Sequence, residues 1–291
     1  MAHIPVLIKE VLDGLHPMPN QNFIDATVGD GGHATAILEK TAPTGKLIAI
    51  DRDSGSISRA KLNLENFGDR VIFINDSFAH ILNIYRESNI EKINGILFDF
   101  GMSSSQIQDS GRGFSFNKDE ILDMRFDVNS HITAEYIINT YNEEELAEIF
   151  KKWGEEEKSR QIAKAIVYAR NSKHIKTTIE LVKIIESVKR RTGKINPSTL
   201  VFQALRIEVN QEMREIEKAL GSITQIIYKG GCVAFISFHS LEDRLIKNWS
   251  RNLEKTGAVK IINKKPITAS VEELVSNPRS RSAKLRIVQK Q

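Results

Sequence analysis

The sequence of 291 residues contains a single cysteine, Cys232, and seven histidines. One thiol excludes an internal disulfide, a zinc site built from several cysteines and a four-cysteine iron–sulfur cluster. The histidines lack the spacing of metal ligands, so we predict no metal site. There is no run of about 18 apolar residues, the length that spans a bilayer. The N-terminal residues also lack the basic start and apolar core of an export signal. We therefore expect a cytoplasmic protein.

Charge is distributed unevenly along the chain. The formal net charge is +4, yet residues 244–291 contain 12 Lys and Arg against three Glu. The preceding residues carry 29 basic and 34 acidic side chains, and a second basic zone at 170–195 has eight basic against two acidic ones. Two basic zones on an otherwise acidic chain favour a polyanionic partner, and we prefer this interpretation to two merely solvated faces.

The hydrophobic pattern changes along the chain. Short apolar runs alternate with helical spacing at first, which predicts a parallel, doubly wound sheet. Helical spacing alone covers roughly residues 105–205, and strand character returns near the C-terminal end. We interpret this as one α/β domain with a helical insertion after its fourth strand. The predicted strands are 22–29, 45–53, 70–78, 93–101, 230–240 and 284–289.

Four of the predicted strands end in an acidic residue: Asp25, Asp51, Asp76 and Asp99. Ligands of doubly wound sheets bind beyond the carboxyl ends of the strands. Packing alone rarely places an acid at the end of a core strand, so the four carboxylates predict one polar edge.

A glycine-rich stretch, "DATVGDGGH", follows the first predicted strand. Gly29-x-Gly31-x-x-Ala34 satisfies the dinucleotide fingerprint, and Asp51 stands near the spacing of a ribose-binding acid. The pattern alone fits either NAD or S-adenosylmethionine. Asp25 precedes the glycines, and the predicted edge is acidic. Carboxylates attract the cationic sulfonium and amino group of S-adenosylmethionine, whereas they repel the pyrophosphate of a dinucleotide. The sequence therefore favours S-adenosylmethionine.

Further candidates for the site have ordinary explanations as well. Asp51 can accept hydrogen bonds from both ribose hydroxyls, and Phe78 is equally an adenine contact or a core aromatic at a strand end. His33 is more often a packing residue than a ligand. Ser237 and His239 in "SFHSLEDR" are candidates for holding a base, against a simple turn in which Ser240 caps a helix with Asp243.

Eight strings follow one another along the chain: "DATVGDGGH", "AIDRD", "GILFDFGMSSSQ", "GRGFSF", "LDMRFD", "FQALRIEVN", "ISFHSLEDR" and "NPRSRSAKLR". With these strings the chain resembles the 16S ribosomal RNA cytosine N4-methyltransferase family of the RsmH or MraW type over nearly its whole length. The resemblance implies a class I S-adenosylmethionine-dependent methyltransferase fold, Rossmann-like and mostly parallel, with an inserted helical domain. It implies methylation of the exocyclic N4 of a cytidine in the decoding centre of 16S rRNA in the small subunit.

The same resemblance implies a domain division and a set of site residues. The methyltransferase domain comprises 1–108 and 206–291, and 109–205 is an insertion for substrate recognition. Asp99 is the candidate catalytic residue, although its role as proton acceptor stays open. Ser105 stands where the family usually has Pro, which weakens the transfer of Gln106. The cofactor-binding residues implied are Gly31, Gly32, His33, Asp51, Phe78, Asp99 and Gln106.

Three alternatives remain at this point. One is a methyltransferase that acts on another nucleic acid. Another is a non-catalytic RNA-binding assembly factor of the ribosome, against which the intact glycine loop, Asp51 and Asp99 count. A dehydrogenase ranks third. The oligomeric state is open, and a homodimer is compatible with the sequence.

Overall fold

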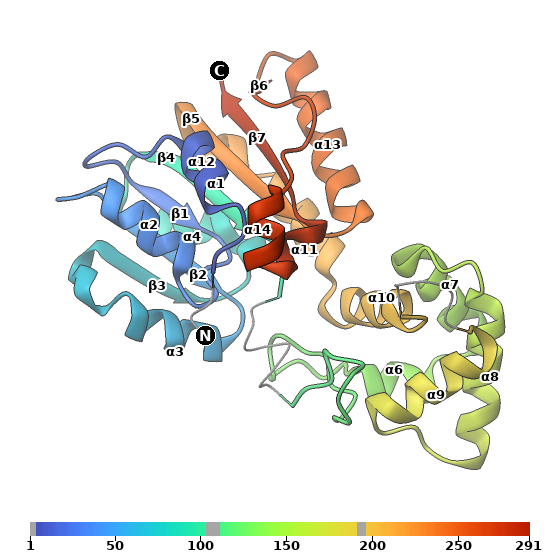
Figure 1. Ribbon diagram of the computed structural model, residues 1–291. Coiled ribbons are helices and arrows are strands. Elements are labelled where there is room, and N and C mark those ends of the chain that lie inside the picture. The colour runs from blue at the N-terminus through green and yellow to red at the C-terminus, as the bar shows by residue number, and fades with distance from the viewer. Residues whose placement is uncertain (1–3, 103–110, 191–195) are drawn as a thin grey trace. The chain divides into compact units, whose positions relative to one another are not determined.

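The computed structural model describes residues 4–102, 111–190 and 196–291 (Figure 1). The chain forms two compact units, which we describe separately. The sheet unit comprises Met1–Gly101 and Met213–Gln291, and the helical unit comprises Met102–Glu212.

The sheet unit is built on seven strands in the order β3-β2-β1-β4-β5-β7-β6. The first five are parallel, whereas β7 runs antiparallel to both β5 and β6. The chain order reverses at β1, which lies between β2 and β4, and such switch points hold the ligands of doubly wound sheets. The strands are β1 (Phe23–Asp25), β2 (Leu47–Asp51), β3 (Val71–Asn75), β4 (Ile93–Asp99), β5 (Ile227–Ser237), β6 (Val259–Ile261) and β7 (Lys284–Lys290).

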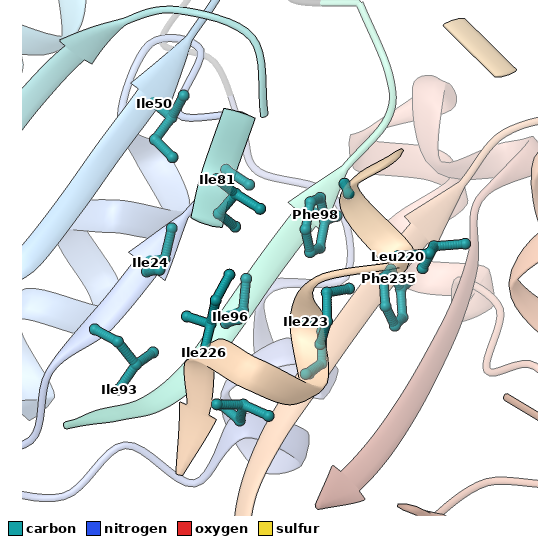
Figure 2. Packing of buried hydrophobic residues seen from close by; sticks show 14 of the residues in the cluster. Ile24, Ile50, Ile81, Ile93, Ile96, Phe98, Leu220, Ile223, Ile226 and Phe235 are labelled. Carbon is teal, nitrogen blue, oxygen red and sulfur yellow. The ribbon is translucent and has the colours of Figure 1, made fainter. Parts of the chain in front are cut away.

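Helices cover both faces of this sheet, and each face has its own apolar cluster. Neighbouring strand residues alternate between the clusters: Phe23 lies in one and Ile24 in the other, as the period of two requires. Figure 2 shows Ile24 with Phe98 and Phe235, whose rings stack at 5.3 Å. The helices are α1 (Ile8–Leu15), α2 (Gly32–Lys40), α3 (Ser54–Asn63), α4 (Ile81–Glu87), α11 (Glu212–Leu220), α12 (Ile223–Ile226), α13 (Ser240–Lys255) and α14 (Val271–Ser276).

The helical unit has a separate core. Capping boxes at Asn142 with Glu145 and at Thr177 with Glu180 start two of its helices, so their boundaries follow from local sequence. No helix in the described parts of the chain is long and apolar enough to cross a membrane. The helices are α6 (Ala134–Thr140), α7 (Glu143–Gly154), α8 (Ser159–Ser172), α9 (Thr178–Val188) and α10 (Thr199–Asn210).

The structure adds three features to the sequence prediction. A break at Gln211, which is left-handed with φ 51° and caps α10 through its N–H, separates α10 from α11. The stretch 263–283, where no element was predicted, contains α14 and the 3-10 helix Pro278–Ser282. The strand β6 was not predicted, because three residues are too few to show a period and its pairing with β7 is non-local.

Candidate functional site

The glycine loop joins β1 to α2 and is open to a ligand at one point. Gly29 and Gly31 are left-handed, with φ values of 54° and 89°, a conformation that glycine adopts without strain. A Cβ placed on Gly29 would meet only the carbonyl oxygen of Thr27, at 3.9 Å. By contrast, a Cβ on Gly32 would lie 2.4 Å from Pro5 Cγ, so packing requires that glycine. Gly31 is the N-cap of α2 and has no side chain to cap it, which leaves backbone donors in the first turn of the helix.

Asp51, at the end of β2, is bound directly to this loop. Its Oδ2 accepts the Gly29 N–H at 2.9 Å and its Oδ1 accepts the Asp53 N–H at 2.8 Å. Burial raises the pKa of Asp51 to about 6, while these two hydrogen bonds lower it. The carboxyl group is therefore ionised near neutral pH and held in one orientation beside the loop.

Asp25 and Asp99 lie on the two strands that flank the switch point. Asp25 ends β1 opposite Ala49 and Leu97, so Asp99 lies two residues further along β4. Burial, followed by the charges of Asp99 and Asp51, raises the pKa of Asp25 to about 8. Three of the four predicted carboxylates therefore influence one another at this edge of the sheet.

His33 is buried in the first turn of α2. Burial lowers its pKa to about 4, so the imidazole is neutral near pH 7. Its Nε2 lies 2.9 Å from the Val6 carbonyl oxygen, which accepts only from an N–H and thereby assigns the proton to Nε2. The Nδ1 atom is then an acceptor, and it lies 3.8 Å from Asp99 Oδ2. Two acceptors facing each other suit a hydrogen-bond donor between them.

The remaining predicted residues have different surroundings. The half-buried Phe78 ring meets Phe98 and Phe100 edge-on at 5.8 and 5.7 Å, so it lies at the margin of the core. Asp76 binds His80 Nδ1 at 2.9 Å within its own turn. Gln106, predicted to bind the cofactor, lies outside the described residues, as does Ser105.

In the turn after β5, the predicted cap of the following helix was wrong. The N-cap of α13 is His239, not Ser240. The His239 side chain accepts the Glu242 N–H, and the Glu242 carboxylate accepts the N–H groups of Phe238 and His239. Glu242, and not Asp243, therefore completes the capping box, as expected for a glutamate at the third helical position.

Other polar groups near this turn make contacts within the fold. Ser237 is fully buried and its hydroxyl donates to the Lys284 carbonyl oxygen at 3.4 Å. Asp243 accepts from Arg286 at 2.6 and 3.2 Å. Arg286 is itself buried on β7, so one cation of the C-terminal basic zone forms an ion pair within the fold and does not face a partner.

Sequence reasoning missed Thr27. Its Oγ1 accepts the Asp99 N–H at 2.7 Å, and its own N–H donates to Asp25 at 3.2 Å. Backbone hydrogen bonding between β1 and β4 extends to the Ala26 N–H, which donates to the Leu97 carbonyl oxygen. At Asp99, further along β4, the Thr27 side chain takes the place of a backbone acceptor. The only signal for this role was its position two residues after an acid at a strand end.

The strand order, with an antiparallel seventh strand, and a glycine loop flanked by acids on β1, β2 and β4 define a class I S-adenosylmethionine-dependent methyltransferase. The predicted fold class is confirmed. The model of the MraW methylase family matches residues 1–291, and the chain belongs to this family. Membership in a methylase family also confirms the predicted cofactor, S-adenosylmethionine.

Related proteins match along their full length. A protein of Hydrogenobaculum sp. (strain Y04AAS1) is 49% identical, with 98% of this chain and 94% of that protein covered. A protein of Sulfurihydrogenibium sp. (strain YO3AOP1) is 44% identical, with 99% of this chain and 98% of that protein covered. Both are named ribosomal RNA small subunit methyltransferase H.

Proposed function

We propose that this protein transfers the methyl group of S-adenosylmethionine to the exocyclic N4 of a cytidine in the decoding centre of 16S rRNA. The names of the relatives support small-subunit rRNA as the substrate, and the sequence resemblance supports cytosine N4. One structural observation carries the proposal. Asp51 on β2 and Asp99 on β4 lie at the strand ends on either side of β1, whose glycine loop is open at Gly29, and Asp25, with a pKa raised to about 8, is largely protonated near pH 7. Such an edge suits a cationic cofactor and repels a pyrophosphate.

Each part of the cofactor has a matching group in the sheet unit. Asp51 is oriented by two backbone donors and accepts the ribose hydroxyls, while Phe78 contacts the adenine ring. The Gly31 N–H donates to the Val28 carbonyl oxygen at 2.8 Å, so the N–H groups of Gly32 and His33, in the first turn of α2, would hold the methionine carboxylate, which the helix dipole favours. Gln106 completes the set that the resemblance implies. When bound, the cofactor supplies a methyl group activated by its positively charged sulfur.

The pair His33 and Asp99 fits the amino group of the methionine moiety. Nδ1 of the neutral imidazole and Oδ2 of the carboxylate are 3.8 Å apart, and an ammonium donor between them hydrogen-bonds to both. A positive charge there also offsets the negative charges of Asp99 and Asp51, which raise the pKa of Asp25. This pair of acceptors has no hydrogen-bond donor for the phosphates of NAD.

Asp99 is also the proposed acceptor for the proton of the nucleophile. The cytosine amine is a poor nucleophile because its lone pair is delocalised into the ring, so the amine and the methyl group must be held in line. The Thr27 hydroxyl fixes the backbone of Asp99 at the end of β4. A carboxylate at that point accepts an amine proton as the nitrogen becomes tetrahedral.

The helical unit is proposed to recognise the RNA. A base that is to be methylated must leave its stack to reach the cofactor, and this requires contacts on the flanking nucleotides. An insertion with its own core provides a second surface for those contacts. The cytoplasm, where ribosomal subunits assemble, is the expected location.

Mass-spectrometric mapping of small-subunit rRNA tests the substrate. Cells that lack this protein should lose N4-methylcytidine at a single position, and wild-type protein, but not Asp51→Ala, should restore it. A modification that persists in the deletion strain would overturn the rRNA assignment. Analysis of tRNA and DNA from the same cells identifies another nucleic acid substrate if one exists.

Calorimetry tests the reaction class independently. The protein should bind S-adenosylmethionine and show no heat with NADH. Cofactor binding without methyl transfer to isolated small subunits would instead favour the non-catalytic assembly factor.

A further inference from the structure

The outward face of α8 in the helical unit has no role in the fold. The helix buries Ser159, Ile162, Ala163 and Ile166 against the core of that unit. Arg160, Lys164 and Tyr168 follow one another at intervals of four, which places them along the opposite side about 6 Å apart. All three are exposed, and Tyr168 exposes 79% of its surface. Gln161 and Asn171, also exposed, lie beside them.

These three side chains have no partner within the described ranges 4–102, 111–190 and 196–291. The structure assigns no hydrogen bond, ion pair or ring contact to the side chains of Arg160, Lys164 or Tyr168. Other exposed tyrosines differ: Tyr136 meets the Tyr141 ring at 6.3 Å, and Lys92 lies over the Tyr228 ring at 3.9 Å. Tyr168 therefore leaves most of its ring to solvent, beside two cations that also have no partner within the described residues.

The charges on this face are also uncompensated. The sequence of α8, "SRQIAKAIVYARNS", contains no acidic residue. Four other cations of the helical unit, by contrast, are paired with acids of the same unit. These pairs are Arg125 with Asp123, Lys173 with Glu180, Lys189 with Glu156 and Arg206 with Glu212.

We propose that the outward face of α8 binds single-stranded RNA, with one base stacked on Tyr168 and phosphates on Lys164 and Arg160. A flat aromatic ring beside two cations is the arrangement that single strands recognise, because every base offers a π-face and every linkage a phosphate. An apolar protein partner fits less well, because Gln161, Lys164 and Asn171 surround the ring. The inference rests on the proposed rRNA substrate and specifies which surface holds it.

Binding of a fluorescently labelled single-stranded oligoribonucleotide to the full-length protein tests this surface. Tyr168→Ala should weaken binding on the order of tenfold, and Tyr168→Phe, which keeps the ring, should bind like the wild type. Arg160→Ala combined with Lys164→Ala should lower the log–log salt slope by about 1.4, or about 0.7 for each lost phosphate contact on a single strand. S-adenosylmethionine affinity and melting temperature should stay unchanged in every variant, because these exposed side chains make no hydrogen bond, ion pair or ring contact within the described residues.

Matched controls come from the sheet unit. Tyr228→Ala removes another exposed ring, and Lys9→Ala with Lys40→Ala removes two other exposed cations, so all should bind the RNA as the wild type does. Wild-type affinity in Tyr168→Ala would overturn the inference. So would unchanged RNA affinity with slower methylation of intact subunits, which would assign the face to a ribosomal protein. A wild-type protein that binds cofactor but no RNA would refute the proposed function and this inference together.

Discussion

Buried carboxylates in the sheet unit and paired carboxylates in the helical unit have opposite pKa shifts. Burial and neighbouring carboxylates raise the pKa of Asp25 to about 8, and burial raises that of Asp51 to about 6. In the helical unit, a hydrogen bond from Lys173 lowers the pKa of Glu180 to about 2. The side chains are chemically alike, so the difference comes from their neighbours.

The two proposed binding sites therefore differ in charge. At the switch point of the sheet, the charges of Asp99 and Asp51 raise the pKa of Asp25, and the cation Arg59 has the smallest of the effects on Asp51. In the helical unit, Arg160 and Lys164 face solvent, whereas Asp123, Glu156 and Glu180 are each paired with a cation. A cationic cofactor suits the first arrangement, and an RNA backbone suits the second.

The largest effect is expected for Asp99→Asn. If its carboxylate accepts the proton, the single-turnover rate of methyl transfer should fall by roughly 10²- to 10⁴-fold, the usual contribution of a general base. Cofactor affinity should stay within several-fold, because the amide oxygen still accepts a hydrogen bond. Asp76→Asn, at an acid that binds His80 instead, is the control. A lower affinity with an unchanged rate at saturation would restrict Asp99 to holding the cofactor.

Next in size is Asp51→Ala. The substitution removes charge-assisted hydrogen bonds to the ribose, so cofactor binding should weaken by roughly 1.5–3 kcal/mol in calorimetry. The exposed Asp69→Ala is the matched control in the same unit. A folded Asp51→Ala protein with wild-type affinity would remove this residue from the site.

In the helical unit, Asp123→Asn should destabilise the protein. Although burial raises the pKa of Asp123, hydrogen bonds from Arg125 outweigh it and hold that pKa below its usual value. The folded state then favours the ionised form, so this stability is present above the unfolded pKa and is lost as the pH falls through the folded value. We expect a loss of about 1–2 kcal/mol near neutral pH by urea unfolding, shrinking in acid. An equal loss at every pH would contradict the ion-pair explanation.

An effect of opposite sign, a gain in stability, is expected for Asp25→Asn. The folded pKa of Asp25 is raised to about 8, so the folded state keeps a proton that the unfolded chain has already released. Wild-type stability should therefore fall as the pH rises from about 4 to about 8 through this group. Asparagine stays neutral and still accepts the Thr27 N–H, so the variant should gain stability relative to the wild type with rising pH. Parallel melting curves across this range would refute the raised pKa.

Local sequence patterns were sufficient to predict most of the strands and helices in the first hundred residues of the sheet unit. The strands from 22 to 101 alternate with helices, so their type follows from apolar period alone, and a parallel sheet brings their carboxyl ends to one edge. That rule predicted the positions of Asp51 and Asp99, and the glycine loop was visible as a motif. Asp76 shows the limit of the rule, because a histidine one turn later binds it.

What the sequence determined by itself was therefore the alternation of the first four strands with helices, the class of the fold and the acids at its strand ends. The tertiary structure alone decided that Thr27 holds the backbone of Asp99, that the Val6 carbonyl sets the tautomer of His33, and that the ring of Tyr168 stays 79% exposed. Periodicity and capping depend on residues a few positions apart. These three outcomes depend on which distant segments meet, or fail to meet, after the chain has folded.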